Sequence, residues 1–118
     1  MVKFRFQDLK IWQLALEIAN ELCDLADELE NKKLFRFAEQ IRGASLSMPN
    51  NIAEGSGSTS KKEFMQFLNI ARRSTFENAN ILLLLQMRNL ITNESLDRWL
   101  DHLDTLCRQL TSFRNTLK

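Results

Sequence analysis

Apolar residues recur at spacings of three and four along most of the chain, which is the period of amphipathic helices. In residues 8–30 one face carries Ile11, Leu14, Ile18, Leu22, Leu25 and Leu29. Comparable stripes run through residues 33–54, 61–90 and 94–116. The pattern therefore predicts four helices with about these bounds, and we expect an all-α, antiparallel, up-down-up-down four-helix bundle.

Polar and small residues mark where these helices begin and end. Asp8 is placed to cap the first helix, and Thr92 or Asn93 the fourth. Residues 55–60, GSGSTS, form the single low-complexity segment, and Gly55 suits the position after a helix end. Ser60 and Glu63 have the spacing of a capping box, which predicts that the third helix begins there.

Pro49 falls inside the second helical pattern. A proline in a helix cannot donate to the carbonyl four residues back, and its ring crowds that turn. Because the apolar period continues past Pro49, we expect the helix to be kinked at this residue and not to end there.

A polar stripe surrounds this proline, formed by Ser47, Asn51 and Glu54. In one interpretation these side chains satisfy backbone groups freed by the kink and the helix end. In the other, the stripe and Arg42 make polar contacts between helices or subunits, with Glu54 or Glu77 opposite a cation. The sequence leaves both open.

Two helices carry more apolar surface than one core needs. The apolar arc of residues 8–30 covers about 200°, where a helix facing one core needs about 100°. The third helix has a second stripe, made of Met65, Phe76, Ala79, Leu83, Met87 and Leu90. The fourth helix has a single stripe. The surplus predicts a homo-oligomer in which the first and third helices are covered on two sides.

Composition agrees with a single helical domain. The 118 residues include one proline, three glycines and no tyrosine, which leaves little material for strands and turns. The net charge is +1, from 16 basic and 15 acidic residues. A nearly neutral protein has no overall field that would steer it to nucleic acid. Any such binding must depend on local clusters.

Local clusters of both signs are present. The basic candidates for nucleic-acid or anion contact are Lys32, Lys33, Arg36 and Arg42 on the second helix, and Lys61, Lys62, Arg72 and Arg73 on the third. An acidic stripe on the first helix carries Glu17, Glu21, Asp24 and Glu28. Each cluster is either a solvated face or a docking surface, for RNA in the basic case and for a neighbouring subunit in the acidic case.

The residues needed for catalysis are sparse. His102 is the single histidine, and Trp99 stands three residues before it, so the Glu-x-x-His pattern of metal-binding bundles is absent. The spacing indicates no Ser-His-Asp arrangement around it. Cys23 and Cys107 fall on apolar stripes, as reduced core cysteines do. No apolar run approaches a membrane span of about 20 residues. We expect a soluble, cytoplasmic protein that is no enzyme and has no metal, cofactor or membrane partner.

Three motifs point to a known family. The run SMPNNIAEG covers residues 47–55 and follows QIR at 40–42, while F-x-D-L-x-x-W-x-x-A covers 6–15 and F-x-x-F-L-x-I-A covers 64–71. Together they resemble the four-helix-bundle proteins encoded in 23S rRNA intervening sequences. Two positions depart from the family pattern: Gly43 stands where arginine is usual, and Arg73 where glycine is frequent.

The resemblance implies a pentameric barrel that acts with RNA. The RNA would be the rRNA intervening element, or the RNA of a reverse transcriptase, which proteins similar to this family assist in diversity-generating retroelements. Those accessory proteins are strongly basic, unlike this chain. The alternative is a structural or protein-interaction oligomer with no nucleic-acid role.

Overall fold

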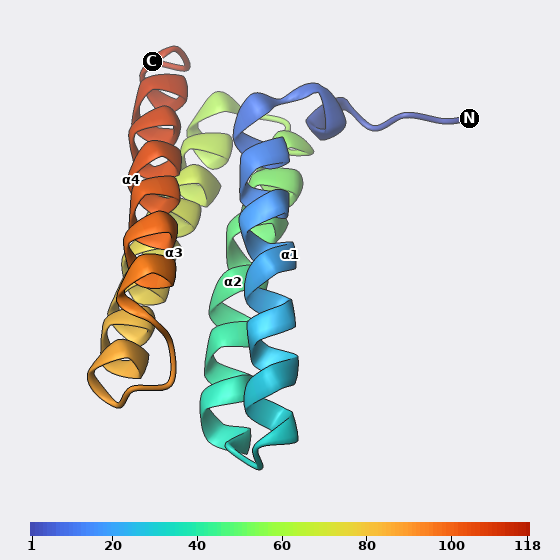
Figure 1. Ribbon diagram of the computed structural model, residues 1–118. Coiled ribbons are helices and arrows are strands. Elements are labelled where there is room, and N and C mark those ends of the chain that lie inside the picture. Colours follow the sequence, from blue (N-terminus) through green and yellow to red (C-terminus); the bar gives the residue numbers. More distant parts are fainter.

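The computed structural model describes residues 1–118 and contains four α-helices. They are α1 (Lys10–Asn31), α2 (Phe35–Ser56), α3 (Lys61–Met87) and α4 (Asn93–Asn115), preceded by a 3-10 turn, η1 (Arg5–Asp8). The chain runs down α1, up α2, down α3 and up α4, so that consecutive helices are joined at alternate ends (Figure 1). The all-α, four-helix fold is confirmed.

Each helix packs mainly on the next one along the chain. The α1–α2 and α2–α3 pairs make the broadest contacts, α3–α4 follows, and a smaller contact between α1 and α4 closes the bundle. The centre is filled by the predicted apolar stripes of all four helices, with Leu22, Ile41, Leu68 and Leu106 among the fully buried side chains. The apolar period therefore identified the core correctly.

Two of the expected helix caps are present and one is wrong. Ser60 Oγ accepts from the Glu63 amide at 3.1 Å, and Thr92 Oγ1 accepts from the Ser95 amide at 3.1 Å. Asp8 instead lies in η1, where its carboxylate pairs with Lys3 Nζ at 2.7 Å. The residue before α1 is Leu9, which offers no side-chain acceptor. The tight η1 turn moves Asp8 away from the free amides.

The expectation for Gly55 is also wrong, because α2 continues to Ser56 and Gly57 is the residue that caps it. A Cβ built on Gly55 would come within 2.7 Å of Phe67 Cβ, so the missing side chain permits close contact between α2 and α3. Pro49 lies inside α2, which passes through it without ending. The bend expected at Pro49 stays a prediction.

Left-handed residues close two helices. Lys33 after α1 and Asn89 after α3 have φ of 63° and 61°. Such a residue is frequent just beyond a helix C-terminus, where it redirects the chain. Asn89 thus ends α3 at Met87, a turn earlier than the apolar stripe suggested, and leaves Leu90 and Ile91 in the loop.

Candidate functional site

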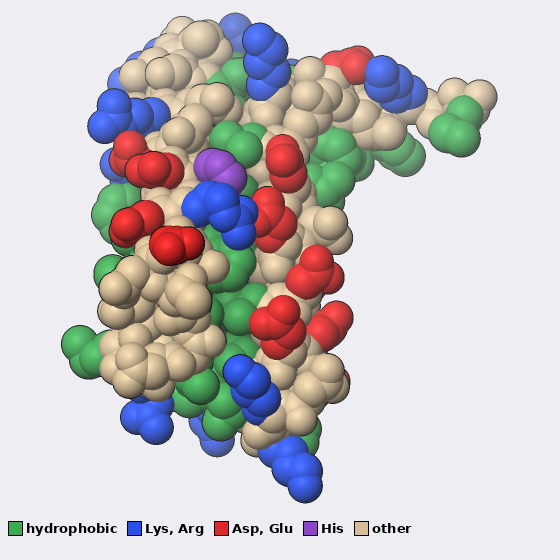
Figure 2. Space-filling model, in the orientation of Figure 1, with side chains coloured by type: hydrophobic (Ala, Val, Ile, Leu, Met, Phe, Trp, Pro, Cys, Tyr) green, Lys and Arg blue, Asp and Glu red, His purple; other side chains and the backbone are tan.

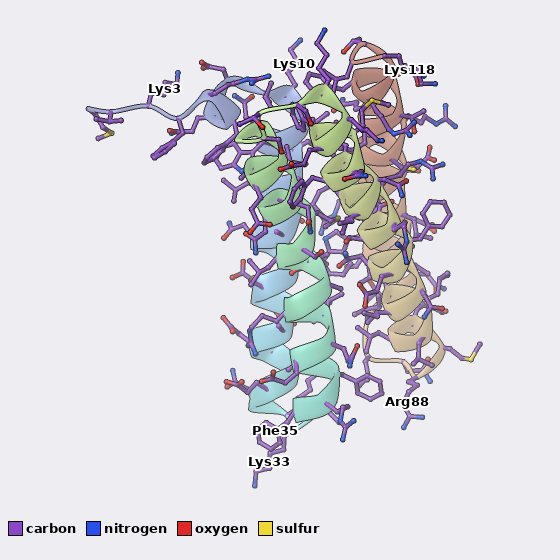
Figure 3. All side chains as sticks on the ribbon, turned by 180° about the vertical axis from the view of Figure 1, so that it is seen from behind. Lys3, Lys10, Lys33, Phe35, Arg88 and Lys118 are labelled. Atoms are coloured by element: carbon purple, nitrogen blue, oxygen red, sulfur yellow. The ribbon has the colours of Figure 1, made fainter.

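The predicted basic residues are divided between the two ends of the bundle. Lys32 and Lys33 follow α1 and Arg36 lies in the first turn of α2, at the end where Figure 3 also places Arg88. Lys61 and Lys62 begin α3 at the opposite end. The 22-residue helix α2 connects the two ends and is about 33 Å long. These residues therefore do not form one continuous surface.

Arg72 and Arg73 lie on α3 between the two ends, in different surroundings. Arg72 Nε donates to Thr111 Oγ1 of α4 at 3.1 Å, and its guanidinium lies over the Phe76 ring at 5.4 Å. Arg73 is exposed and makes no side-chain hydrogen bond or ion pair. The structure thus fixes Arg72 in place and leaves Arg73 free.

Apart from Arg42, the predicted basic residues share one property, which is that no carboxylate lies within ion-pair distance of them. The basic residues that do form ion pairs are Arg42 and three that were not candidates, namely Lys3, Arg98 and Arg108. An unpaired cation at the surface keeps its charge available to an anionic ligand.

One predicted basic residue, Lys62, lines a pocket between α3 and α4 together with a second basic residue, Arg114. Lys62, Met65, Gln66 and Asn69 of α3 line a pocket together with Arg114 near the C-terminus of α4. We call this pocket the end groove. It contains no carboxylate, and four of its five lining side chains carry N–H donors.

Arg114 was not predicted from the sequence. Its side chain makes no hydrogen bond or ion pair, and its Nε is shielded from solvent without an acceptor. Leaving such a donor unsatisfied costs about 1 to 3 kcal/mol. From the sequence alone, a cation in the last turn of a helix is explained by the helix dipole. Its meeting with Lys62 depends on how α4 packs on α3.

The polar stripe of α2 joins this helix to α3. Ser47 and Ser74 hydroxyls lie 2.8 Å apart, and because Ser74 also donates to the Ile70 carbonyl at 2.9 Å, Ser47 is the donor to Ser74. Asn51 Nδ2 donates to the Ser47 carbonyl at 2.8 Å and to its hydroxyl at 3.0 Å. These bonds form a polar contact between two helices of one chain.

The other members of the motif lie apart from this contact. Arg42 turns to α1, with Nη2 at 3.0 Å from Asp27 and Nη1 at 3.5 Å from Glu30. Glu54 and Glu77 are exposed and form no ion pair within the chain. The structure thus brings Ser47 and Asn51 together, and it leaves Arg42, Glu54 and Glu77 separate.

Asn78 extends the α2–α3 contact and was also missed. It is fully buried, and its Nδ2 donates to the Ala44 carbonyl at 2.8 Å and to the Ser74 carbonyl at 2.7 Å. Its Oδ1 has no partner. The sequence did show an asparagine four residues after Ser74 on a largely apolar helix face. Periodicity alone does not predict that such an asparagine is buried and bonded to the next helix.

One member of the acidic stripe crosses to α4. Glu21 Oε1 accepts from Arg98 Nη1 and, at 3.2 Å, from Trp99 Nε1. The hydrogen bond from Arg98 lowers the pKa of Glu21, with a further contribution from Trp99 and an opposing one from partial burial. In Figure 2 acidic side chains lie on both sides of the line where α1 and α4 meet, and most basic ones gather toward the ends.

No three His, Cys, Asp or Glu side chains come close enough together to hold a metal ion. None of the helices has the length and apolar content needed to cross a membrane.

These contacts define a class of protein, a four-helix bundle in which a Ser-Asn motif on the second helix bonds to the third. The family model described as 23S rRNA-intervening sequence protein matches residues 7–112. The chain therefore belongs to the family of 23S rRNA-intervening sequence proteins, as the motifs suggested.

A solved structure has the same fold. It is a protein of unknown function from the S23 ribosomal protein family of Bacteroides thetaiotaomicron, 27% identical, with a TM-score of 0.84. The match covers 88% of this chain and 97% of that one. None of the curated proteins matches the chain.

Proposed function

We propose that this chain is a non-enzymatic, self-associating helical bundle that acts with RNA. The observation that carries self-association is a row of exposed apolar side chains on α3. Phe76 is 60% exposed, Leu83 48% and Met87 77%. Covering a large apolar side chain stabilises a contact by about 1.5 to 3 kcal/mol, so this row favours a partner surface.

A second exposed apolar pair lies on the other helix hairpin. Leu16 of α1 and Leu46 of α2 are 44% and 40% exposed and line one shallow pocket with Ala19 and Cys23. When two different patches of one chain meet, the contact is head-to-tail, and it closes into a ring if the rotation permits. The family resemblance implies a ring of five.

The native mass tests self-association. Light scattering on the purified protein should give a multiple of the 13.8 kDa chain mass, five times this value by resemblance. The double variant Phe76→Gln, Met87→Gln should lower the mass, because it removes apolar area from the α3 row. Phe35→Gln is the matched control, since Phe35 is about as exposed as Phe76 but begins α2 and lies outside the α3 row. A wild-type mass of one chain would contradict the proposal.

The RNA role is supported by family membership and by the unpaired cations of α3. RNA would be either the rRNA intervening element or the RNA of a reverse transcriptase partner. We place the protein in the cytoplasm, where reduced cysteines such as Cys23 and Cys107 persist. Titration of a labelled structured RNA should show binding that weakens steeply with salt, as counterion release requires. Absence of binding at low salt would favour the purely structural oligomer.

A further inference from the structure

We propose that the end groove, formed by Lys62, Gln66 and Asn69 of α3 and by Arg114 of α4, binds the phosphates of a single-stranded RNA segment. The inference rests on the proposed RNA role and assigns it to one place on the molecule. The lining residues come from the beginning of α3 and the end of α4, which meet at the same end of the bundle (Figure 1).

The chemistry of the end groove suits phosphate. Lys62 offers a compact positive charge, and the planar guanidinium of Arg114 matches two phosphate oxygens at once. Gln66 and Asn69 add neutral amide donors. No acidic side chain lines the groove, so nothing in it repels an anion.

Of the three arginines on α4, only the one in the end groove has no carboxylate partner. Arg98 pairs with Glu21, and Arg108 Nε lies 3.0 Å from Asp104 Oδ2. Arg114 is the third arginine of the helix, and its side chain has neither an ion pair nor a hydrogen bond, with its Nε buried and unsatisfied. The basic charge of α4 is therefore neutralised within the protein everywhere except at the end groove.

The row of donors is too long for one phosphate ion. Lys62, Gln66, Asn69 and Arg73 are exposed and follow each other at spacings of four, three and four, so they share one face of α3. Eleven residues of helix rise about 16 Å. One strand of a duplex carries a phosphate about every 3.4 Å of axis, so a row of this length spans about five phosphates. The length of the row therefore favours single-stranded RNA over a single phosphate ion as the ligand.

The test compares two double variants that each remove two positive charges. Lys62→Gln, Arg114→Gln alters the end groove, and Lys33→Gln, Arg36→Gln alters unpaired cations at the opposite end. The probe is a labelled single-stranded RNA of about 12 nucleotides, long enough for the row. Fluorescence anisotropy at several salt concentrations gives the affinity and its salt slope, and thermal melting checks that each variant folds.

We expect the groove variant to bind about tenfold more weakly at low salt and to lose about 1.4 from the salt slope, since each single-strand phosphate contact contributes about 0.7. The opposite-end variant should bind as the wild type does. Equal weakening in both variants would show a response to net charge alone and overturn the proposal. If the groove variant binds like the wild type, the RNA role stands and this site is wrong. If the wild type binds no RNA at low salt, the RNA role fails as well.

A second measurement distinguishes two possible ligands of the end groove, single-stranded RNA and a free anion. The Arg114 Nε–H resonance should shift on adding the RNA, because a phosphate bound at the terminal Nη groups of the guanidinium changes the electronic environment of the neighbouring Nε–H. Inorganic phosphate at the same phosphate concentration should leave the resonance unmoved and should not displace the RNA. A saturable shift with inorganic phosphate that competes with RNA would identify a small-anion site and contradict the proposal.

Discussion

Gly55 of α2 lies so close to Phe67 of α3 that a Cβ on Gly55 would come within 2.7 Å of Phe67 Cβ. The same Cβ would meet the Phe64 ring at 2.9 Å. Because Phe67 Cβ is attached directly to the backbone, it can move only if α3 moves. The last turn of α2 can therefore pack this closely on the first turns of α3 only because residue 55 has no side chain.

Replacing Gly55 by alanine should destabilise the protein. Forcing an extra methyl group into a close-packed contact costs about 1 to 3 kcal/mol, which outweighs or cancels the gain of about 1 kcal/mol in helix propensity. Urea unfolding followed by circular dichroism measures the change in the free energy of unfolding. A clearly stabilised Gly55→Ala variant would show that the two helices separate at little cost.

Gly43, in the same helix, differs from Gly55 because it has room for a side chain. A Cβ added there meets no atom within 4 Å. Only helix propensity changes, so Gly43→Ala should raise the free energy of unfolding by about 1 kcal/mol. The same urea titration tests this expectation, and a destabilised variant would point to a contact of Gly43 with another subunit.

Asn78 should matter more for stability than its neighbour Asn80. Asn78→Ala removes hydrogen bonds to the Ala44 and Ser74 carbonyls and leaves a buried cavity, which should cost about 2 to 4 kcal/mol. Asn80 is exposed on the same helix, so Asn80→Ala should change stability by less than about 0.5 kcal/mol. Thermal melting of the two variants compares them, and similar melting temperatures would refute the buried role.

The contact of Glu21 with Arg98 and Trp99 should make stability depend on pH. The pKa of Glu21 is lower in the folded chain than its usual 4.5, so the ionised carboxylate favours folding. This contribution is fully present above about pH 4.5 and is lost as the pH falls through the lower folded-state pKa.

At neutral pH Glu21→Gln should therefore reduce the free energy of unfolding by about 1 kcal/mol, the scale of a partly exposed ion pair. The difference from the wild type should shrink when unfolding is repeated near pH 3. Glu17→Gln is the control, because Glu17 lies on the same acidic stripe without an ion pair. A Glu21→Gln deficit that stays constant with pH would contradict this account.

Local spacing determined the helices, the core and the family of this protein. The apolar period placed Leu22, Ile41, Leu68 and Leu106 in the core, and the Ser60 and Thr92 caps followed from side chains only three residues from the amides they bind. These features depend on neighbours within one or two helical turns. For that reason they can be recognised without knowing how the helices pack.

The tertiary structure decided which polar groups meet. Glu21 and Trp99 are 78 residues apart, Asn78 and Ala44 are 34 apart, and Lys62 meets Arg114 only across the α3–α4 groove. The sequence placed Gly55 at a helix end, because the residue that explains this glycine, Phe67, lies on another helix and its proximity cannot be read from local spacing. Helical periodicity defines the face on which a residue lies. The residue that it contacts on the next helix depends on how the two helices are rotated and shifted against each other, and the packing of the whole core sets that arrangement.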